Sequence, residues 1–261
     1  MMDYKIETFP KTRIATFDIC SVGIQKHQVA AMIEIDVSES REKIKKLRNK
    51  TNRISFTAWL MKVISLTIKD HELAAGFLKG KRKVFVFNDI NISLAVEKKL
   101  NGQKVPIPLI IEKTNEKSIE VITKQINDAR DKELTNKDIV LHNKSSHLER
   151  LYYVLPGFIR RFFWKYLLRH PRLAFKKMGN VAITSIGMVG NVSGWFIPIS
   201  VHPICFGISN ITKKPIVIGN KIEIREILNM TILIDHDVID GSPMARFISN
   251  LSRNIEKGYG L

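Results

Sequence analysis

The order of strand-like and helix-like segments is the feature that most restricts how this chain can fold. Apolar or alternating segments typical of strands lie at 29–38, 84–87, 90–97, 106–112, 181–187, 204–209, 215–226 and 230–235. Amphipathic helical patterns lie at 39–49, 55–70, 118–133 and 242–258. Because strands and helices do not alternate strictly, we expect an α/β (α+β) protein with a mixed β-sheet and helices on one side. Asn101-Gly102 and Gly219-Asn220 each predict a hairpin turn.

The composition is that of an ordinary globular protein. The chain has 261 residues, of which 44% are hydrophobic and 26% charged, so disorder and membrane-embedded classes are excluded. It has no internal repeat and no low-complexity linker, and we predict a single domain over residues 1–261. No apolar signal region and no run of about 18 apolar residues occurs, so we expect a cytoplasmic protein.

The net charge of +17 is the unusual number in the composition. Such a charge attracts polyanions, including phosphorylated cofactors, nucleic acid and anionic lipid, but it does not choose among them. A basic surface can also serve only to keep the protein soluble. Cys20 and Cys205 lie far apart and in no metal-ligand spacing, so we expect neither a disulfide framework nor a metal site.

Residues 142–179 combine apolar, aromatic and basic side chains. They predict two short basic amphipathic helices, broken near Pro156 and Pro171. One apolar face is expected to comprise Leu148, Leu151, Tyr152, Leu155, Phe158, Ile159, Phe162, Phe163, Tyr166 and Leu167. A cationic face is expected to comprise Arg150, Arg160, Arg161, Lys165, Arg169, Arg172, Lys176 and Lys177. Two interpretations stay open: a hairpin that packs on its own subunit or tightens an oligomer, or peripheral contact with an anionic membrane.

One short motif, DHDVIDG at 235–241, combines residue types suited to catalysis. A strand is expected to end in Asp235 and His236, and a helix to begin after Asp240 and Gly241. A histidine at a strand end has the rigid support that a general base needs. Gly241 is expected to allow a backbone conformation that a side chain would forbid. The HxxxDG spacing alone is weak evidence, because a lone histidine at a strand end is more often structural.

Several blocks together resemble the superfamily of dihydrolipoamide acyltransferases and chloramphenicol acetyltransferases. The family motif DHRVIDG resembles DHDVIDG here, and IPLSRIR resembles FPKTRIA at 9–15. A longer block that begins INIGIAV in the family resembles residues 90–122, which begin INISLAV. Further blocks are similar, in the same order, at 26–39, 55–77, 181–191 and 196–209. Only about 138–179 lies outside the resemblance. The resemblance implies a coenzyme A-dependent acyltransferase core with the chloramphenicol acetyltransferase-like fold, in a form without its own lipoyl domain.

The resemblance also implies catalytic roles. His236 is expected to remove the proton of a thiol, whose thiolate then attacks the thioester carbonyl of an acyl donor. The oxyanion formed in this attack is expected to meet the hydroxyl group of Thr184, with Ser185 as the alternative.

A structural ion pair is the role that the resemblance implies for Asp240. Its expected partner is Arg13, although Lys11 or an unrelated carboxylate could form the real pair. Asp237 replaces the family's common arginine and Lys26 replaces a proline before His27, so the sequence departs from the family pattern on the acceptor side of the site.

The resemblance implies acyl-coenzyme A as the substrate. It also implies a homotrimer or a higher assembly of trimers, with His236 from one subunit and Thr184 from the next in each site. A lipoyl group is expected only if another chain supplies it. The rival interpretation is a catalytically idle scaffold, or a protein that binds anionic lipid or nucleic acid. No aromatic-basic stacking motif of the RNA-binding kinds occurs, so no specific nucleic acid is expected. Motifs of other enzyme classes, such as GxSxG and HExxH, are missing from the sequence.

Overall fold

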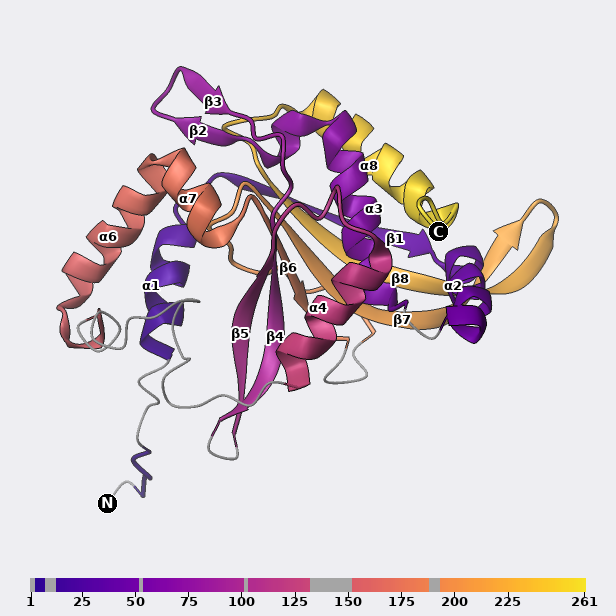
Figure 1. Ribbon diagram of the computed structural model, residues 1–261, viewed down its shortest axis with the longest axis horizontal. Coiled ribbons are helices and arrows are strands. Elements are labelled where there is room, and N and C mark those ends of the chain that lie inside the picture. The colour runs from indigo at the N-terminus through magenta and orange to yellow at the C-terminus, as the bar shows by residue number, and fades with distance from the viewer. Residues whose placement is uncertain (1–2, 8–12, 52–53, 101–102, 132–151, 188–192) are drawn as a thin grey trace.

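A six-stranded mixed sheet forms the framework of the protein in a computed structural model, which describes residues 3–7, 13–51, 54–100, 103–131, 152–187 and 193–261 (Figure 1). The strand order is β1-β8-β7-β6-β4-β5, and β2 and β3 form a separate hairpin. The strands are β1 Gln28–Asp36, β2 Phe77–Lys79, β3 Lys83–Phe85, β4 Ile92–Leu100, β5 Gln103–Ile111, β6 Val181–Ser185, β7 Ile204–Ile218 and β8 Lys221–Asp235. The β6 strand runs parallel to β4 and β7, whereas the other pairs are antiparallel, which confirms the predicted mixed sheet.

Helices cover one face of this sheet (Figure 1). The helical elements are α1 Arg13–Gly23, α2 Ser38–Thr51, α3 Phe56–Asp70, the 3-10 helix η1 Glu72–Ala75, α4 Ile119–Asp131, α6 Gly157–Arg169, α7 Pro171–Met178 and α8 Gly241–Glu256. The main core lies between α3, α4 and α8 and the sheet, where Trp59, Phe206 and Phe247 are fully buried. The Ser55 hydroxyl caps α3 by accepting from the Ala58 N–H at 3.1 Å, so the most apolar helix begins where it can reach the core. Helices on one side of the sheet were predicted, and the structure confirms this.

The β7–β8 hairpin corrects the strand boundaries expected from sequence. The segments predicted at 204–209, 215–226 and 230–235 are two strands of 15 residues each, joined at the predicted turn, where Gly219 has a φ of 59°. The lysine-rich stretch that resembles a loop stays in the ladder, with Lys213 opposite Glu226. A register shift between Ile208 and Ile211 absorbs the irregularity. The hairpin therefore extends well beyond the rest of the sheet (Figure 1). The predicted turn at Asn101-Gly102 lies outside the described residues.

A second apolar cluster joins α1, α6 and α7 at one end of the molecule, and sequence analysis did not predict α1. Its buried members are Val22, Phe77, Leu167, Ala174, Met178 and Val201. Asp18 of α1 is buried beside this cluster and accepts from the Arg160 guanidinium at 2.6 Å and from the Tyr152 hydroxyl at 2.8 Å. Because a buried carboxylate is costly without partners, these contacts bind α6 firmly to α1.

Helices α6 and α7 lie in the described part of the segment predicted at 142–179, with Pro156 at the N-cap of α6 and Pro171 opening α7. The prediction of a single apolar face is wrong. Leu167 is buried against α1, whereas Phe158 and Phe162 point into solvent on another side of the helix. The residues before 152 in this segment, including Leu148, Arg150 and Leu151, lie outside the described part. The interpretation of the segment as an insertion in a single domain stays a prediction.

Gly179 connects α7 to β6 in a conformation that requires glycine. Its φ is 76° and its ψ is −177°, and a Cβ atom there would lie 2.4 Å from the carbonyl oxygen of Asn91. That same carbonyl accepts from the N–H groups of Asn180 and Val181, so it has no freedom to retreat. The start of β6 is thereby fixed against the start of β4.

Gly179→Ala should lower the free energy of unfolding by about 3 kcal/mol, because the variant combines a glycine-only conformation with a backbone clash. Gly80→Ala is the matched control: Gly80 has a φ of 63°, but nothing lies within 4 Å of the added Cβ atom. The control should lose only about 1 kcal/mol. Denaturant unfolding of both variants measures the difference, and equal losses would contradict this account.

Candidate active site

His236 lies at the first position after β8, in the turn that leads to α8. Its side chain is exposed, and its backbone N–H donates to the carbonyl oxygen of His27 at 2.9 Å. His27 immediately precedes β1, the neighbour of β8 in the sheet. The backbone of His236 is therefore held between two adjacent strands, and its exposed imidazole ring can contact another molecule.

An ion pair between Lys26 and Asp235 fixes the base of this turn. The Asp235 side chain is 9% exposed and that of Lys26 is 20% exposed, so both charges are largely removed from water. Asp235 also donates its backbone N–H to the carbonyl oxygen of Pro203 at 3.0 Å and accepts from the backbone N–H of Asp237 at 3.3 Å. Lys26, a departure from the family pattern, thus neutralises the carboxylate next to the candidate base.

Asp237, the other departure, pairs with His27 on the surface. The Nδ1 atom of His27 lies 3.0 Å from Oδ1 of Asp237. This hydrogen bond and the carboxylate charge raise the pKa of His27 above its usual value. His27 consequently holds a positive charge beside His236 over a wider pH range than a free histidine does.

Asp240 and Gly241 lie at the start of α8, but Gly241 does not adopt the glycine-only backbone conformation that the sequence predicted. Asp240 is the N-cap residue and its carbonyl oxygen accepts from the Met244 N–H at 3.1 Å, but its exposed side chain makes no capping hydrogen bond. Gly241 is not among the glycines with positive φ, and a Cβ atom there would meet nothing within 4 Å. The predicted reason for glycine at 241 is therefore wrong for the single chain. Arg13 is the exposed first residue of α1, and its pairing with Asp240 stays a prediction.

Thr184 is half-buried on β6 and belongs to the sheet face opposite α3, α4 and α8. Side chains alternate along a strand, so Thr184 faces away from the core that contains Ile183, and Ser185 faces the core side. The two hydroxyl candidates are thus separated by the sheet. Only Thr184 lies on the face that the helices leave open.

A residue that sequence analysis missed lies in the same row as Thr184. Gly207 is opposite Thr184 on β7, and Thr231 is opposite Gly207 on β8. The Oγ1 atom of Thr231 is fully buried and has no hydrogen-bond partner among the described residues. Phe196 and Pro198 cover this row, because each would lie 3.3 Å from a Cβ atom at Gly207. The signal was available in LNMTILID, where polar residues at 229 and 231 alternate with apolar ones.

His236 and Thr184 are not brought together within one chain. Val181 aligns with Ile204, and Ile204 aligns with Ile234. Thr184 on β6 lies three residues beyond this row. His236, which follows β8, lies two residues beyond the row in the opposite direction along the strands. The β7 strand lies between β6 and β8. At about 3.3 Å per residue and about 4.8 Å per strand, the two Cα atoms are roughly 19 Å apart. A site that uses both side chains therefore needs a second copy of the chain.

Two other groups that could do chemistry are occupied or inert. Burial lowers the pKa of His202 to about 4, and its two ring nitrogens lie 3.0 Å from the Met178 carbonyl oxygen and 3.3 Å from the Ser200 hydroxyl. Burial raises the pKa of the Cys205 thiol to about 12, so little reactive thiolate forms. Neither residue competes with His236 for the role of general base or nucleophile.

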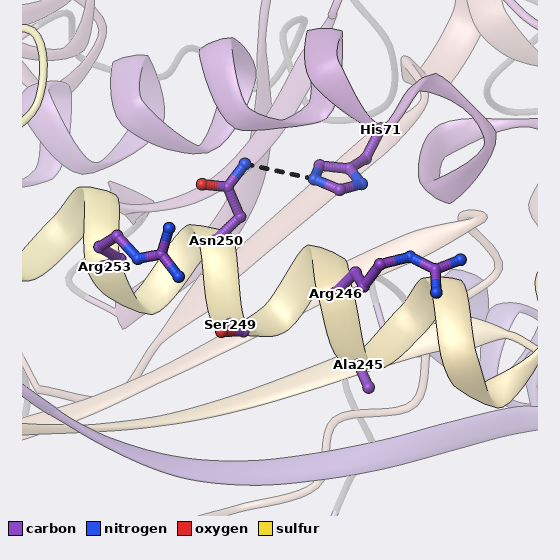
Figure 2. Close-up of a pocket in the computed structure, with 6 residues that line it drawn as sticks. All are labelled: His71, Ala245, Arg246, Ser249, Asn250 and Arg253. Carbon is purple, nitrogen blue, oxygen red and sulfur yellow. Dashed lines mark hydrogen bonds between the residues drawn. The ribbon is translucent and has the colours of Figure 1, made fainter.

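A pocket of about 480 Å³ lies between α8 and the end of α3, and none of the predicted catalytic residues lines it (Figure 2). Figure 2 shows the amide of Asn250 pointing toward His71, with Nδ2 and Nε2 3.3 Å apart. Arg246 and Arg253 give the pocket positive charge. Within the described ranges, no group of three or more His, Cys, Asp or Glu side chains could hold a metal ion.

Comparison with solved structures defines the class of fold. The chain is similar to the probable dihydrolipoamide acetyltransferase of Listeria monocytogenes 4b F2365, with a TM-score of 0.70, 20% identity and coverage of 98% of this chain and 95% of that one. It is also similar to the cubic core of the pyruvate dehydrogenase multienzyme complex, with a TM-score of 0.69, 15% identity and coverage of 97% and 92%. The fold is that of a dihydrolipoamide acetyltransferase core.

Sequence comparisons identify the family. The lipoamide acyltransferase component of the branched-chain alpha-keto acid dehydrogenase complex of Bacillus subtilis (strain 168) is 24% identical over 235 residues, which are 86% of this chain and 46% of that protein. The dihydrolipoyllysine-residue acetyltransferase component of the pyruvate dehydrogenase complex of Mycoplasma pneumoniae is 25% identical over 208 residues, or 78% and 42%. The chain spans less than half the length of these two relatives. The family model of the 2-oxoacid dehydrogenases acyltransferase (catalytic domain) matches residues 24–140 and 169–260, and the chain belongs to this family.

Asp237→Asn should lower the pKa of His27 toward 6.5, because it removes the carboxylate that stabilises the charged ring. Since the pKa in the folded state is raised, the stabilising contact is fully present below pH 6.5 and is lost as pH rises through the folded value. Titration of the ring protons by NMR measures this shift. Asp237→Glu keeps the charge and is the control; an unchanged His27 titration in Asp237→Asn would refute the pairing.

Proposed function

We propose that this protein is a coenzyme A-dependent acyltransferase in which His236 is the general base. The observation that carries the proposal is the placement of His236: an exposed imidazole on a rigid turn, in a chain of the acyltransferase catalytic-domain family. A base in this position can reach a bound thiol without rearrangement of the sheet.

The proposed reaction moves an acyl group between two thiols. The imidazole of His236 accepts the proton of the attacking thiol, and the thiolate adds to the carbonyl carbon of the thioester. The tetrahedral intermediate collapses as its carbon–sulfur bond to the leaving thiolate breaks. That thiolate then takes the proton from the imidazolium. Because a thiol has a pKa near 8.5, a neutral imidazole close to it gives a useful thiolate fraction at neutral pH.

Thr184 is the proposed donor to the oxyanion of the intermediate. Its hydroxyl is on the sheet face opposite α3, α4 and α8, and Gly207 beside it on β7 adds no side chain to the row. Thr231 is proposed as a second hydroxyl group that lines the same row. Removal of one such donor typically costs a factor of about 10² to 10³ in rate.

A homotrimer is the proposed assembly, with each site formed by His236 of one subunit and Thr184 of the next. The separation of roughly 19 Å within one chain supports a shared site. The long β7–β8 hairpin also supports assembly, because Val217, Ile222 and Ile224 on it are 69%, 75% and 77% exposed. Apolar side chains gathered on a projecting hairpin are typical of a contact with another subunit. One of the similar solved structures is the cubic core of a multienzyme complex, which agrees with an oligomer.

Dihydrolipoamide, carried on a lipoyl group of another chain, is the proposed thiol substrate. This follows from the names of the curated relatives, which are lipoamide and dihydrolipoyllysine-residue acyltransferases. A release assay for coenzyme A thiol across acyl chain lengths tests it, with dihydrolipoamide, amine and alcohol acceptors in parallel. A cytoplasmic location stays a prediction.

His236→Ala and His236→Asn should remove turnover while the circular dichroism spectrum and unfolding midpoint stay unchanged, because the side chain is exposed. Thr184→Ala should reduce kcat by a factor of about 10² to 10³. His71→Ala is the control, since His71 is not part of the proposed site. Near-normal rates in the His236 and Thr184 variants would reject this mechanism, whereas no turnover by the unchanged protein would support the rival view of an idle scaffold.

Co-expression of His236→Ala with Thr184→Ala should restore part of the lost activity. In a shared site, the histidine must come from one variant and the threonine from the other, so about a quarter of randomly assembled sites are intact. Co-expression of His236→Ala with His236→Asn is the control and should stay inactive. No recovery in verified mixed trimers would place both residues of a working site in one chain and reject the shared site.

A further inference from the structure

The exposed side of α6 has a composition that its packing on α1 does not require. Phe158, Phe162 and Phe163 are 68%, 66% and 54% exposed, and Ile159 and Tyr166 are 38% and 47% exposed. Large aromatic side chains gain stability from burial, and on this side no described residue buries them. The helix contacts α1 through its other side, where Leu167 is buried and Arg160 meets Asp18.

Helical geometry makes these exposed side chains one continuous surface. At about 100° per residue, positions 158, 162, 166, 159 and 163 fall within an arc of about 140°. Lys165 and Arg169 project at the edge of the same arc, and both are exposed. The apolar residues and the cations therefore face solvent together, which corrects the separate apolar and cationic faces expected from sequence.

The cationic character continues onto α7 and the β2–β3 hairpin. The α7 helix packs beside β2, and the Phe175 and Phe87 rings stack with centroids 4.0 Å apart (Figure 1). The exposed cations of the three elements are Arg161, Lys165, Arg169, Arg172, Lys176, Lys177, Lys79, Lys81, Arg82 and Lys83. No Asp or Glu occurs in residues 77–87 or 152–178. We call this surface, with the exposed aromatic residues of α6, the α6 basic-aromatic surface.

We propose that the α6 basic-aromatic surface binds the face of an anionic phospholipid bilayer. Aromatic rings can enter the interface between headgroups and acyl chains, while the lysine and arginine side chains stay at the phosphates. A polybasic surface with no acidic residues is the electrostatic complement of an anionic leaflet. The proposed contact is peripheral, with α6 lying at the surface of the bilayer. Among the described residues, no helix is both long and apolar enough to cross a membrane.

Charge and shape argue against the two other occupants. A second copy that met this surface with its own would bring cations against cations, which costs free energy without counterions. Nucleic acid would match the charge, and a single strand can stack its bases on aromatic rings, but Ile159 within the arc offers no ring for stacking. An anionic bilayer can interact with both parts of the surface, because its interface accepts the apolar arc and its headgroups attract the cations.

The first test is co-sedimentation of the full chain with vesicles of phosphatidylcholine that contain phosphatidylserine, and with vesicles of phosphatidylcholine alone. Binding should occur only to the anionic vesicles and should weaken at high salt. Sedimentation with neither vesicle at low salt overturns the proposal.

The aromatic part of the surface is tested with Phe158→Ser/Phe162→Ser, which should lower the vesicle partition coefficient at least tenfold. Both side chains are exposed, so the variant should fold, and its acyltransferase activity and unfolding midpoint check this. Leu73→Ser/Val121→Ser removes two exposed apolar side chains elsewhere and should leave vesicle binding unchanged. If the aromatic variant binds vesicles like the unchanged protein, the attraction is to any polyanion and the proposal fails.

The cationic part is tested with Lys165→Gln/Arg169→Gln, for which each lost charge should weaken binding roughly fivefold. Lys45→Gln/Arg48→Gln on α2 removes the same charge from exposed positions on another element. Equal losses of vesicle binding in the two variants would show that only net charge matters, and would overturn the proposal that the α6 basic-aromatic surface binds the bilayer. A change in oligomer mass in the α6 variants, without vesicle binding by the unchanged protein, would assign the surface to a subunit contact instead.

Discussion

The antiparallel ladder between β7 and β8 is the constraint on which the rest of the structure depends. It aligns Ile204 with Ile234, and so sets where the chain leaves the sheet at His236. The β6 strand then takes its register from β7, which sets the position of Thr184. A one-residue slip in the β6–β7 ladder would turn Thr184 toward the core and Ser185 toward the open face. The catalytic proposal therefore rests on strand register more than on any single contact of the histidine.

The sequence predicted most of the sheet, because apolar alternation and turn residues are local signals. It also predicted α3 and α8, whose apolar stripes are continuous. It missed α1, where the buried side is built around Asp18, a residue that no hydrophobic pattern selects. It broke β7 at a lysine-rich stretch, which belongs to a strand only when its partner strand is known, and it also broke β8 at residues 227–229. Long-range pairing of this kind is not encoded in any short window.

The candidate site was predictable as a list of residues and only in part as an arrangement. The motif identified His236, and the resemblance identified Thr184 and implied a site shared between subunits, but the separation of the two residues within one chain follows only from the strand order. The partners Lys26 and His27 were visible in the sequence merely as departures from a family pattern. In the structure they surround the histidine turn with charge, through Asp235 and Asp237. The role predicted for Gly241 was wrong. A glycine can occupy a position where the backbone requires glycine or a position where other residues would also fit, and the sequence alone does not distinguish the two cases.

The buried contact between Asp18 and Arg160 joins α1 to α6, and both residues lie outside the ranges that the family model matches. Without Arg160 and Tyr152, the carboxylate would stay buried with no cation beside it. The two segments cannot then change independently over evolutionary time. Relatives that lack α6 should carry a neutral residue at the position of Asp18, and those that acquired α6 should have acquired the acid with it.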